Sequence, residues 1–275
     1  MGNVAIELRG ITKRFGSVVA NRDVNLSVNS GEILSLLGEN GSGKTTLMNM
    51  ISGIYFPDEG HIFIDGNEVV IKSPKDAFDY KIGMIHQHFK LVDVFTAAEN
   101  VVLGLEEKYN IKKAAQRVAE ISNKYGFDID PNKKIYEMSV SEKQTVEIIK
   151  VLYRGANILI LDEPTAVLTP QETQKLFAVL RRMKDDGKAI IIITHKLHEV
   201  LDISDRVSVL RKGEYIGTVD THKTNEAELT EMMVGKKIDL NIERSEPKDP
   251  QKRIEINHIN CMSRDGIPLL NDVSF

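Results

Sequence analysis

The chain has 275 residues, of which 41% are hydrophobic and 28% are charged, so it can bury a core and keep a polar surface. Its net charge of −4 disfavours nucleic acid as the main partner, and it disfavours simple electrostatic adhesion to an anionic membrane. The single cysteine, Cys261, excludes an intrachain disulfide framework, and the longest aliphatic runs are far too short to span a bilayer. We therefore expect a cytosolic setting and, at a membrane, a peripheral role.

Segments that alternate between hydrophobic and polar residues dominate the first seventy positions. Residues 4–15, 18–28 and 60–69 each follow this period of two. Such a period is typical of strands that bury one face and expose the other. The pattern predicts an N-terminal antiparallel β subdomain.

Three short aliphatic runs occur, one near the start of the chain and two in its second half. A helical pattern follows each of them. The runs cover residues 32–37, 157–161 and 189–194. They are typical of strands buried on both faces, as in a mainly parallel sheet. Helical patterns follow at 44–52, 171–186 and 197–204. The repeated order of strand, loop and helix predicts an α/β core.

The stretch from about 90 to 155 lacks strand signals. Within it, residues 111–126 form an amphipathic helical pattern that ends at Gly126. We expect this region to be a helical subdomain inserted into the core.

The first aliphatic run leads into "GENGSGKTT", residues 38–46. Gly38, Gly43, Lys44 and Thr45 satisfy the pattern G-x-x-x-x-G-K-[ST] of a phosphate-binding loop. Glycines let the backbone aim successive N–H groups inward, the lysine neutralises phosphate oxygens, and the threonine hydroxyl can ligate Mg²⁺. The candidate nucleotide-binding residues of the loop are Gly38, Asn40, Gly41, Ser42, Gly43, Lys44, Thr45 and Thr46.

Two adjacent carboxylates, Asp162 and Glu163, follow the second aliphatic run. Catalytic groups of α/β sheets collect at this edge, just beyond the carboxyl ends of the strands. We expect Asp162 to hold Mg²⁺ and Glu163 to polarise a water for attack on the terminal phosphate.

The ordered set "GENGSGKTT", "HQH", "MSVSEKQ", "LDEPTA" and "ITHK" resembles the nucleotide-binding subunit of an ABC transporter. The resemblance covers the whole chain. It implies an ATPase with a P-loop NTPase core, the mainly parallel sheet, the antiparallel β subdomain and the inserted helical subdomain, with ATP and Mg²⁺ as its ligands.

The resemblance also assigns roles to three further residues and to one segment. Gln87 matches a glutamine that touches Mg²⁺ and joins the core to the helical subdomain, and the following segment 90–104 would face a membrane permease. His195 matches a histidine that contacts the γ-phosphate, and Phe15 stands where an aromatic ring stacks on adenine. Metal ligation would fall to Thr45, Gln87 and Asp162. His86 and His88 flank Gln87, but two histidines without further ligands at metal spacing are weak evidence for a metal site.

The chain departs from the family at its signature loop. Val140 and Ser141 stand where the family has two glycines, although Ser139 and Glu142 still predict a capping box for the next helix. In the family this helix start faces the nucleotide of an opposite domain, so Ser139 and Ser141 are candidate nucleotide contacts. Thr169 stands near a family aspartate and still predicts a good helix start.

The C-terminal residues echo the N-terminal ones. Residues 254–259 resemble residues 6–11, and residues 271–275 resemble residues 22–26. We interpret residues 1–235 as one cassette, 236–253 as a charged linker, and 254–275 as the truncated start of a second cassette. The chain would then be a fragment of a longer twin-domain protein.

Twin cassettes with an intact phosphate loop and an altered signature resemble the ATPases of simple-sugar and nucleoside importers. The resemblance implies a peripheral protein on the cytoplasmic face of the membrane. Its partners would be permease subunits, a second cassette of the same chain and, indirectly, a substrate-binding protein. Two alternatives are a soluble twin-cassette ATPase acting on ribosomes or nucleic acid, and a nucleotide-binding module that does not hydrolyse ATP.

Overall fold

The computed structural model describes residues 3–105, 110–236, 254–263 and 268–275. The chain divides into two units, Met1–Ile238 and Asp239–Phe275. The predicted linker 236–253 lies outside the described residues apart from its first position.

A ten-stranded sheet organises the first unit. Its strands are β1 (Val4–Phe15), β2 (Val18–Asn29), β3 (Ile33–Leu37), β4 (Glu59–Ile64), β5 (Asn67–Val69), β6 (Ile82–Ile85), β7 (Ile158–Asp162), β8 (Ala189–Ile193), β9 (Arg206–Arg211) and β10 (Glu214–Asp220). Across the sheet they follow the order β5-β4-β1-β2-β10-β9-β3-β8-β7-β6.

The sheet has a parallel half and an antiparallel half. β9, β3, β8, β7 and β6 pair in parallel, whereas β1, β2, β4 and β5 pair antiparallel. The halves meet where β2 pairs with β10. The predicted α/β core with an N-terminal antiparallel subdomain is therefore confirmed.

Two local predictions about strands need correction. The stretch 60–69 is a hairpin, β4 and β5, because Asp65 (φ 49°) and Gly66 (φ 79°) form a tight turn between them. Two consecutive residues with positive φ match the twist of a hairpin, and Asp-Gly is a preferred pair there. Strands β6, β9 and β10 were also missing from the sequence-based prediction. β6 is only four residues long, which is too short to show a period.

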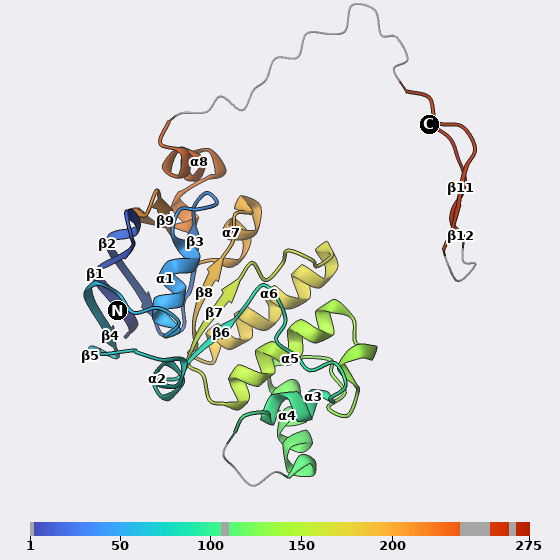
Figure 1. The fold of residues 1–275 in the computed structure, drawn as a ribbon, viewed down its shortest axis with the longest axis horizontal. Helices are drawn as coiled ribbons and strands as arrows, with labels where there is room; N and C mark the ends of the chain where they lie inside the picture. The colour runs from blue at the N-terminus through green and yellow to red at the C-terminus, as the bar shows by residue number, and fades with distance from the viewer. Residues whose placement is uncertain (1–2, 106–109, 237–253, 264–267) are drawn as a thin grey trace, which may run out of the picture. The chain divides into compact units, whose positions relative to one another are not determined.

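Eight α-helices occur among the described residues. They are α1 (Lys44–Ile51), α2 (Pro74–Asp79), α3 (Ala97–Val102), α4 (Ile111–Tyr125), α5 (Val140–Tyr153), α6 (Pro170–Asp185), α7 (Leu197–Ile203) and α8 (Glu226–Val234), with 3₁₀ helices at Ile135–Glu137 and Thr221–Lys223. In Figure 1, α3, α4 and α5 lie together on the side away from β1 and β4. This group is the predicted helical subdomain.

Local side-chain hydrogen bonds fix the helix ends where the sequence predicts them. Ser139 and Thr169 each form a complete capping box, at the starts of α5 and α6. Gly126 ends α4 in the left-handed conformation, with φ 72°. Each box satisfies backbone N–H groups that have no partner within the helix.

The helical subdomain has a hydrophobic core of its own. Val118 of α4, Val146 and Ile149 of α5, and Ile135 are fully buried there. A polar contact ties this subdomain to the core, because the Tyr125 hydroxyl donates to Asp186 across 2.6 Å.

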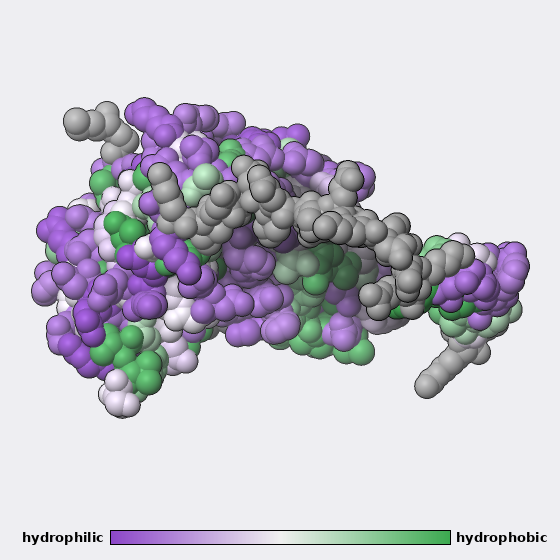
Figure 2. Space-filling model, turned by 90° about the horizontal axis from the view of Figure 1, so that it is seen from above, coloured by the Kyte–Doolittle hydropathy of each residue, from purple (hydrophilic) through white to green (hydrophobic). Residues whose placement is uncertain are grey.

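One face of the cassette is mostly polar. On the face shown in Figure 2, hydrophilic residues predominate and hydrophobic residues form separate patches. Of the helices that the structure describes, none has the length and apolar character needed to cross a bilayer.

The second unit contains two antiparallel strands, β11 (Ile259–Met262) and β12 (Pro268–Val273). Of the residues that the structure describes in this unit, two have positive φ, His258 (52°) and Asp272 (52°). Their counterparts in the sequence repeat, Gly10 (63°) and Asp23 (47°), have it as well. The similarity of the two segments therefore extends to the backbone.

A hydrogen bond repeats at the same place. In the first unit the N–H of Gly10 donates to Asn25 Oδ1 across 3.0 Å. In the second unit the N–H of His258 donates to Ser274 Oγ across 2.9 Å. In the first unit the bond joins β1 to β2, and in the second it joins the residue before β11 to the residue after β12, so the same hydrogen bond occurs at matching positions of the repeat.

The core of the helical subdomain generates a stability prediction. Ile149→Ala removes three buried carbon atoms from a closely packed site, so we expect it to lower the free energy of unfolding by about 2–5 kcal/mol. Val140→Ala, on the exposed first turn of the same helix, should change it by less than about 0.5 kcal/mol. Urea unfolding of both variants measures this, and equal effects would contradict the described packing.

Candidate functional site

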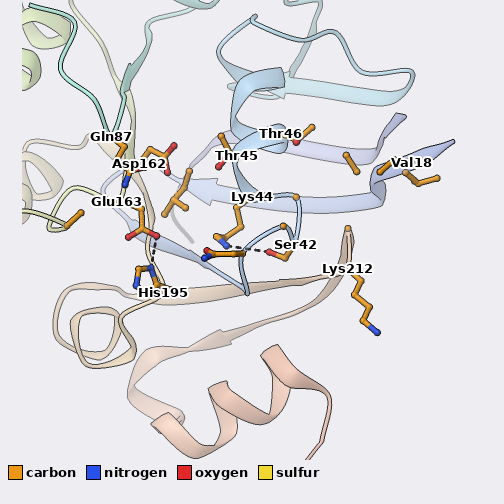
Figure 3. A pocket seen from close by; sticks show the side chains of 18 residues that line it. Val18, Ser42, Lys44, Thr45, Thr46, Gln87, Asp162, Glu163, His195 and Lys212 are labelled. Carbon is orange, nitrogen blue, oxygen red and sulfur yellow. Dashed lines mark hydrogen bonds and ion pairs between the residues drawn. The ribbon is translucent and has the colours of Figure 1, made fainter. Parts of the chain in front are cut away.

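A cavity of about 760 Å³ opens at the carboxyl ends of β3, β7 and β8. It brings together predicted residues from four separate loops (Figure 3). Those that line it are Asn40, Gly41, Ser42, Gly43, Lys44, Thr45, Thr46, Gln87, Asp162, Glu163 and His195. Parallel strands with matched registers place these loops at one edge of the sheet.

Four predicted nucleotide contacts are not among the residues that line the cavity: Phe15, Gly38, Ser139 and Ser141. The ring of Phe15 instead forms a T-shaped contact with Tyr55, with 5.2 Å between centroids. Val18, at the start of β2, and Lys212, in the turn between β9 and β10, line the cavity and were missed from the sequence. Neither belongs to a motif, and they come from segments far apart in sequence, since β2 pairs with β10 next to the site.

The phosphate loop packs tightly against its neighbours at Gly43. Gly43 has φ 96° and precedes α1. A Cβ atom at this position would lie 2.4 Å from the carbonyl oxygen of Ala20, closer than any real contact. Gly41 also has a positive φ of 80°, but a Cβ there would meet open space. The loop therefore needs glycine at Gly43 for both conformation and room.

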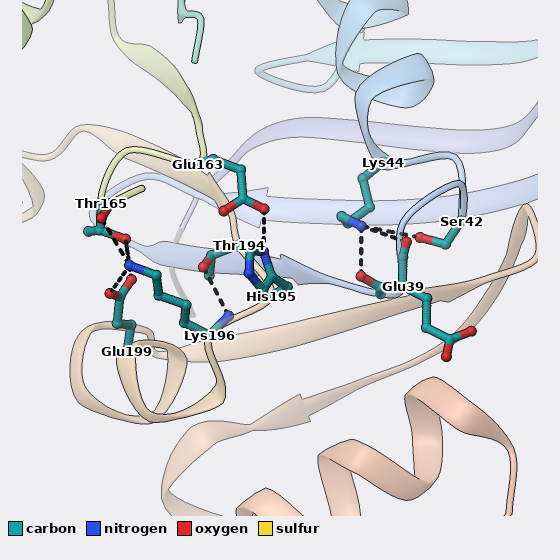
Figure 4. Close-up of polar contacts among 10 residues, drawn as sticks. Glu39, Ser42, Lys44, Glu163, Thr165, Thr194, His195, Lys196 and Glu199 are labelled. Carbon is teal, nitrogen blue, oxygen red and sulfur yellow. Dashed lines mark hydrogen bonds and ion pairs between the residues drawn. The ribbon is translucent and has the colours of Figure 1, made fainter. Parts of the chain in front are cut away.

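Lys44 lies at the centre of the loop and is only 7% exposed. Its ammonium donates to the carbonyl oxygens of Gly38 (2.7 Å) and Glu39 (2.9 Å). Burial lowers the pKa of Lys44, and the negative charges of Glu163 and Asp162 oppose that shift. These contacts hold a positive charge at the floor of the cavity (Figure 4).

Asp162 ends β7 and is partly buried near the phosphate loop. Burial raises its pKa, the charge of Glu163 raises it further, and Lys44 acts in the opposite direction. A carboxylate held in this way is stabilised when a cation binds beside it.

Glu163 and His195 form a pair across two loops. Glu163 Oε1 lies 2.8 Å from His195 Nδ1, so the carboxylate accepts a hydrogen bond from the imidazole. The other carboxylate oxygen, Oε2, is buried and has no hydrogen-bond partner. Glu163 also adopts a left-handed backbone with φ 48°, which is strained for a residue with a side chain. A carboxylate that has one oxygen bonded to an imidazole, the other oxygen without a partner and a strained backbone can orient and polarise a water.

A protein-family model matches the part of the chain that contains the phosphate loop and Glu163. The model described as ABC transporter matches residues 21–166, more than half of the chain. The chain belongs to the ABC transporter family. Its described first unit is one ATP-binding cassette of that family.

Curated relatives are similar over almost the whole chain. The chain is 44% identical over 265 residues to the nucleoside import ATP-binding protein NupA of Lactococcus lactis subsp. cremoris, covering 95% of this chain and 52% of that protein. It is 47% identical over 273 residues to the guanosine import ATP-binding protein NupO of Bacillus subtilis, covering 98% and 54%. It is 43% identical over 256 residues to the ribose import ATP-binding protein RbsA 1 of Burkholderia thailandensis, covering 90% and 49%. The chain thus spans about half the length of these relatives.

A solved structure supports the fold. The ADP conformation of MJ1267, an ATP-binding cassette of an ABC transporter, superposes with a TM-score of 0.75 at 24% identity. The match covers 85% of this chain and 99% of that cassette. At this identity the likeness concerns the fold.

Within the cassette, the altered signature loop keeps a regular helix start. Ser139 Oγ accepts from the N–H of Glu142 (3.3 Å), and Glu142 accepts from the N–H of Ser139 (2.7 Å). Ser141 Oγ lies 3.2 Å from Ser139 Oγ. Val140 and Ser141 therefore do not disrupt the local fold of the loop.

A buried polar cluster links the loops on which Glu163 and His195 lie. Thr165 Oγ1 donates to Glu199 across 2.5 Å, and Lys196 donates to Glu199 (3.0 Å) and to the Thr165 carbonyl (2.9 Å) (Figure 4). Thr165 and Glu199 are 1% and 6% exposed. The cluster therefore holds the two loops in a fixed relation.

The geometry of the phosphate loop generates a second stability prediction. Gly43→Ala should lower the free energy of unfolding more than Gly41→Ala does. Both changes carry the cost of a left-handed alanine, about 1–2 kcal/mol, but only Gly43→Ala also forces a clash with the backbone of β2. Chemical denaturation of the two variants tests this. A Gly41 variant as unstable as the Gly43 variant would show that the clash is unimportant.

Proposed function

We propose that this cassette binds Mg-ATP in the described cavity and hydrolyses it to drive an ABC importer. One observation carries the proposal: Lys44, Asp162 and the Glu163–His195 pair all line a single cavity. These side chains would provide a cation for phosphate, a carboxylate for the metal and a carboxylate for the water.

The residues present fit both ligands. Helix α1 begins at Lys44, and Gly43, Lys44 and Thr45 at its start line the cavity, so its first backbone N–H groups are available for phosphate oxygens. Asp162, whose pKa is raised by burial, would gain a counter-charge from Mg²⁺, with Thr45 and Gln87 as further oxygen ligands. When bound, Mg²⁺ would neutralise charge on the phosphates.

The division of labour among the side chains follows from their contacts. Lys44 would hold the β- and γ-phosphates, since besides the two carbonyls its ammonium makes only a long contact of 3.5 Å to Ser42 Oγ, which phosphate oxygens could replace. Glu163, whose Oε2 lacks a partner, would accept a proton from the attacking water. His195 would hold Glu163 in place and contact the γ-phosphate.

The names of the relatives support the importer and its substrate class. Two are named for import of nucleosides or guanosine, and one is named for import of ribose. We propose that the transported molecule is a nucleoside or a simple sugar. We further propose that the cassette works at the cytoplasmic face of the membrane with permease subunits. These names favour import over action on ribosomes or nucleic acid.

We also propose that residues 254–275 belong to a second cassette. The shared positive-φ positions and the repeated hydrogen bond at His258 support this domain assignment, as does the greater length of the relatives. A second cassette would supply the signature helix that faces the described cavity. Ser139 and Ser141 of this cassette would face the other nucleotide.

The role of Lys44 generates a binding prediction. Lys44→Ala should weaken ATP binding by about ten- to a hundredfold, because a hydrogen bond to a charged group contributes about 1.5–3 kcal/mol. Lys212→Ala, at the far end of the same cavity, should have a much smaller effect. Titration with a fluorescent ATP analogue measures both. A Lys44 variant that binds as tightly as the parent would refute the phosphate-loop assignment.

The role of Glu163 generates a prediction about turnover. Glu163→Gln keeps the shape and the hydrogen bonds of the side chain but removes its basicity. ATP should therefore still bind while hydrolysis falls by about a hundredfold or more. Steady-state ATPase assays on the full-length protein assembled with its permease test this. Normal turnover by the variant would exclude Glu163 as the base and direct attention to His195.

A further inference from the structure

Asn21 of β2 is a fully buried amide that contacts the phosphate loop. The residue is 0% exposed, and the other buried positions of the strand are the aliphatic Val24, Leu26 and Val28. Its Nδ2 donates to the carbonyl oxygen of Gly43 across 3.3 Å. Its Oδ1 is buried and has no hydrogen-bond partner among the residues that the structure describes. An amide thus occupies an inward position of β2, where the pattern of the strand predicts an aliphatic side chain.

This buried amide is unfavourable for folding alone. A buried polar atom without a partner costs more free energy than a single neutral hydrogen bond returns. An aliphatic side chain at position 21 would avoid that cost. Unpaired buried polar groups are rare in native proteins, and local rules are broken mainly at functional sites. The amide of Asn21 therefore indicates a role in the loop that it contacts.

The peptide between Gly43 and Lys44 is held at its carbonyl oxygen by two donors. Besides Asn21, the N–H of Leu47 donates to the Gly43 oxygen across 2.9 Å. Asn21 and Leu47 are not among the described residues that line the ATP cavity, whereas the peptide itself belongs to the cavity wall. The C=O and N–H of a trans peptide point in opposite directions. A carbonyl fixed toward β2 and α1 therefore turns the N–H of Lys44 toward the cavity.

The start of α1 offers donors that the protein itself does not use. Lys44 and Thr45 mark this start in the close-up of the cavity (Figure 3). Among the residues that the structure describes, neither the N–H of Gly43 nor that of Lys44 donates a hydrogen bond to a protein acceptor. Such N–H groups bind an anion well only when they point at it. The direction of the Gly43–Lys44 peptide therefore sets how well the site binds phosphate.

Strand pairing fixes the place of the amide. β2 pairs with β1, with Asn21 opposite Lys13, and the N–H of the next residue, Arg22, donates to the Gly213 carbonyl across 2.8 Å. A Cβ atom built on Gly43 would come within 2.6 Å of Asn21 Nδ2, so the amide packs closely on the loop. A donor carried by a strand of the sheet is placed more precisely than one carried by a loop.

We propose that Asn21 is a positioning residue of the ATP site, whose amide fixes the Gly43–Lys44 peptide with the N–H of Lys44 directed at the phosphates. The inference rests on the proposed binding of Mg-ATP and adds to it a residue outside the phosphate-loop motif. Because this N–H needs no reorientation when the nucleotide arrives, the cost of binding is lower. Removal of the amide should therefore weaken ATP binding without weakening the fold.

The first test replaces the amide by an apolar side chain. Asn21→Leu removes the donor and the unpaired oxygen together. The affinity of the 275-residue chain for ATP should fall by about three- to tenfold, which is the effect of one neutral hydrogen bond. The midpoint of urea unfolding without nucleotide should equal that of the parent or exceed it. Titration with a fluorescent ATP analogue and urea unfolding measure the two quantities.

A control on the same strand separates positioning from general stability. Val24→Ala, at another fully buried position of β2, should lower the midpoint of urea unfolding and leave the affinity for ATP unchanged. Asn21→Ala removes the amide without adding bulk, so it decides the test if Asn21→Leu does not fold, and it should weaken ATP binding by the same factor. If a folded Asn21 variant binds ATP as tightly as the parent, or if Val24→Ala weakens binding equally, the inference is overturned.

The direction of the peptide can also be observed. In the isotope-labelled parent chain, Mg-ATP should shift the amide proton signal of Lys44 in the nuclear magnetic resonance spectrum, because this N–H would gain a phosphate oxygen as acceptor. The shift should be smaller in Asn21→Leu at saturating ATP. An equal shift would mean that the peptide keeps its direction without Asn21, and that result would refute the positioning role.

The parent chain and Lys44→Ala separate this inference from the function on which it rests. If the parent does not bind ATP, or if Lys44→Ala binds it as tightly as the parent, the proposed function fails and the inference fails with it. If Lys44→Ala binds ATP more weakly than the parent while both Asn21 variants bind it as tightly, only the role of Asn21 is refuted.

Discussion

The register of three parallel strands is the constraint on which the site depends. β3 and β7 both pair with β8, so that Leu36 and Asp162 face the same residue, Ile193. The three strands therefore end at the same edge of the sheet, and the loops that follow them begin there. The phosphate loop, the Asp162–Glu163 pair and His195 meet there because of this register. A shift of one residue in any of the three strands would turn its side chains to the opposite face and separate the loops.

Polar contacts keep the side chains of these loops within hydrogen-bond distance of one another. Residues 163 and 195 are 32 positions apart in sequence, yet their side chains approach within 2.8 Å. The buried cluster of Thr165, Lys196 and Glu199 also joins the same two loops by hydrogen bonds. This connection is consistent with the strained backbone of Glu163, because a left-handed glutamate persists only where its surroundings over-determine it.

The cassette has two pockets of different chemistry. The ATP cavity combines cationic and anionic groups, as a site for a metal-bound phosphate requires. The pocket between α2, β6 and α5 is predominantly cationic. Gln87 lines the first and His86 lines the second, so adjacent residues of one loop reach both. A structural change at either site would therefore also affect the loop that follows β6.

Local features could be predicted from the sequence alone, because they depend on residues close together in the chain. The phosphate loop, the capping boxes at Ser139 and Thr169, and the end of α4 at Gly126 are of this kind. The short strand β6, the exclusion of Phe15 from the cavity wall and the entry of Val18 and Lys212 were decided by the tertiary structure. They depend on strand pairing between distant segments, for which a single sequence carries no periodic signal. The contact between Glu163 and His195, and the cationic pocket on α5, likewise exist only once the sheet and helices have packed.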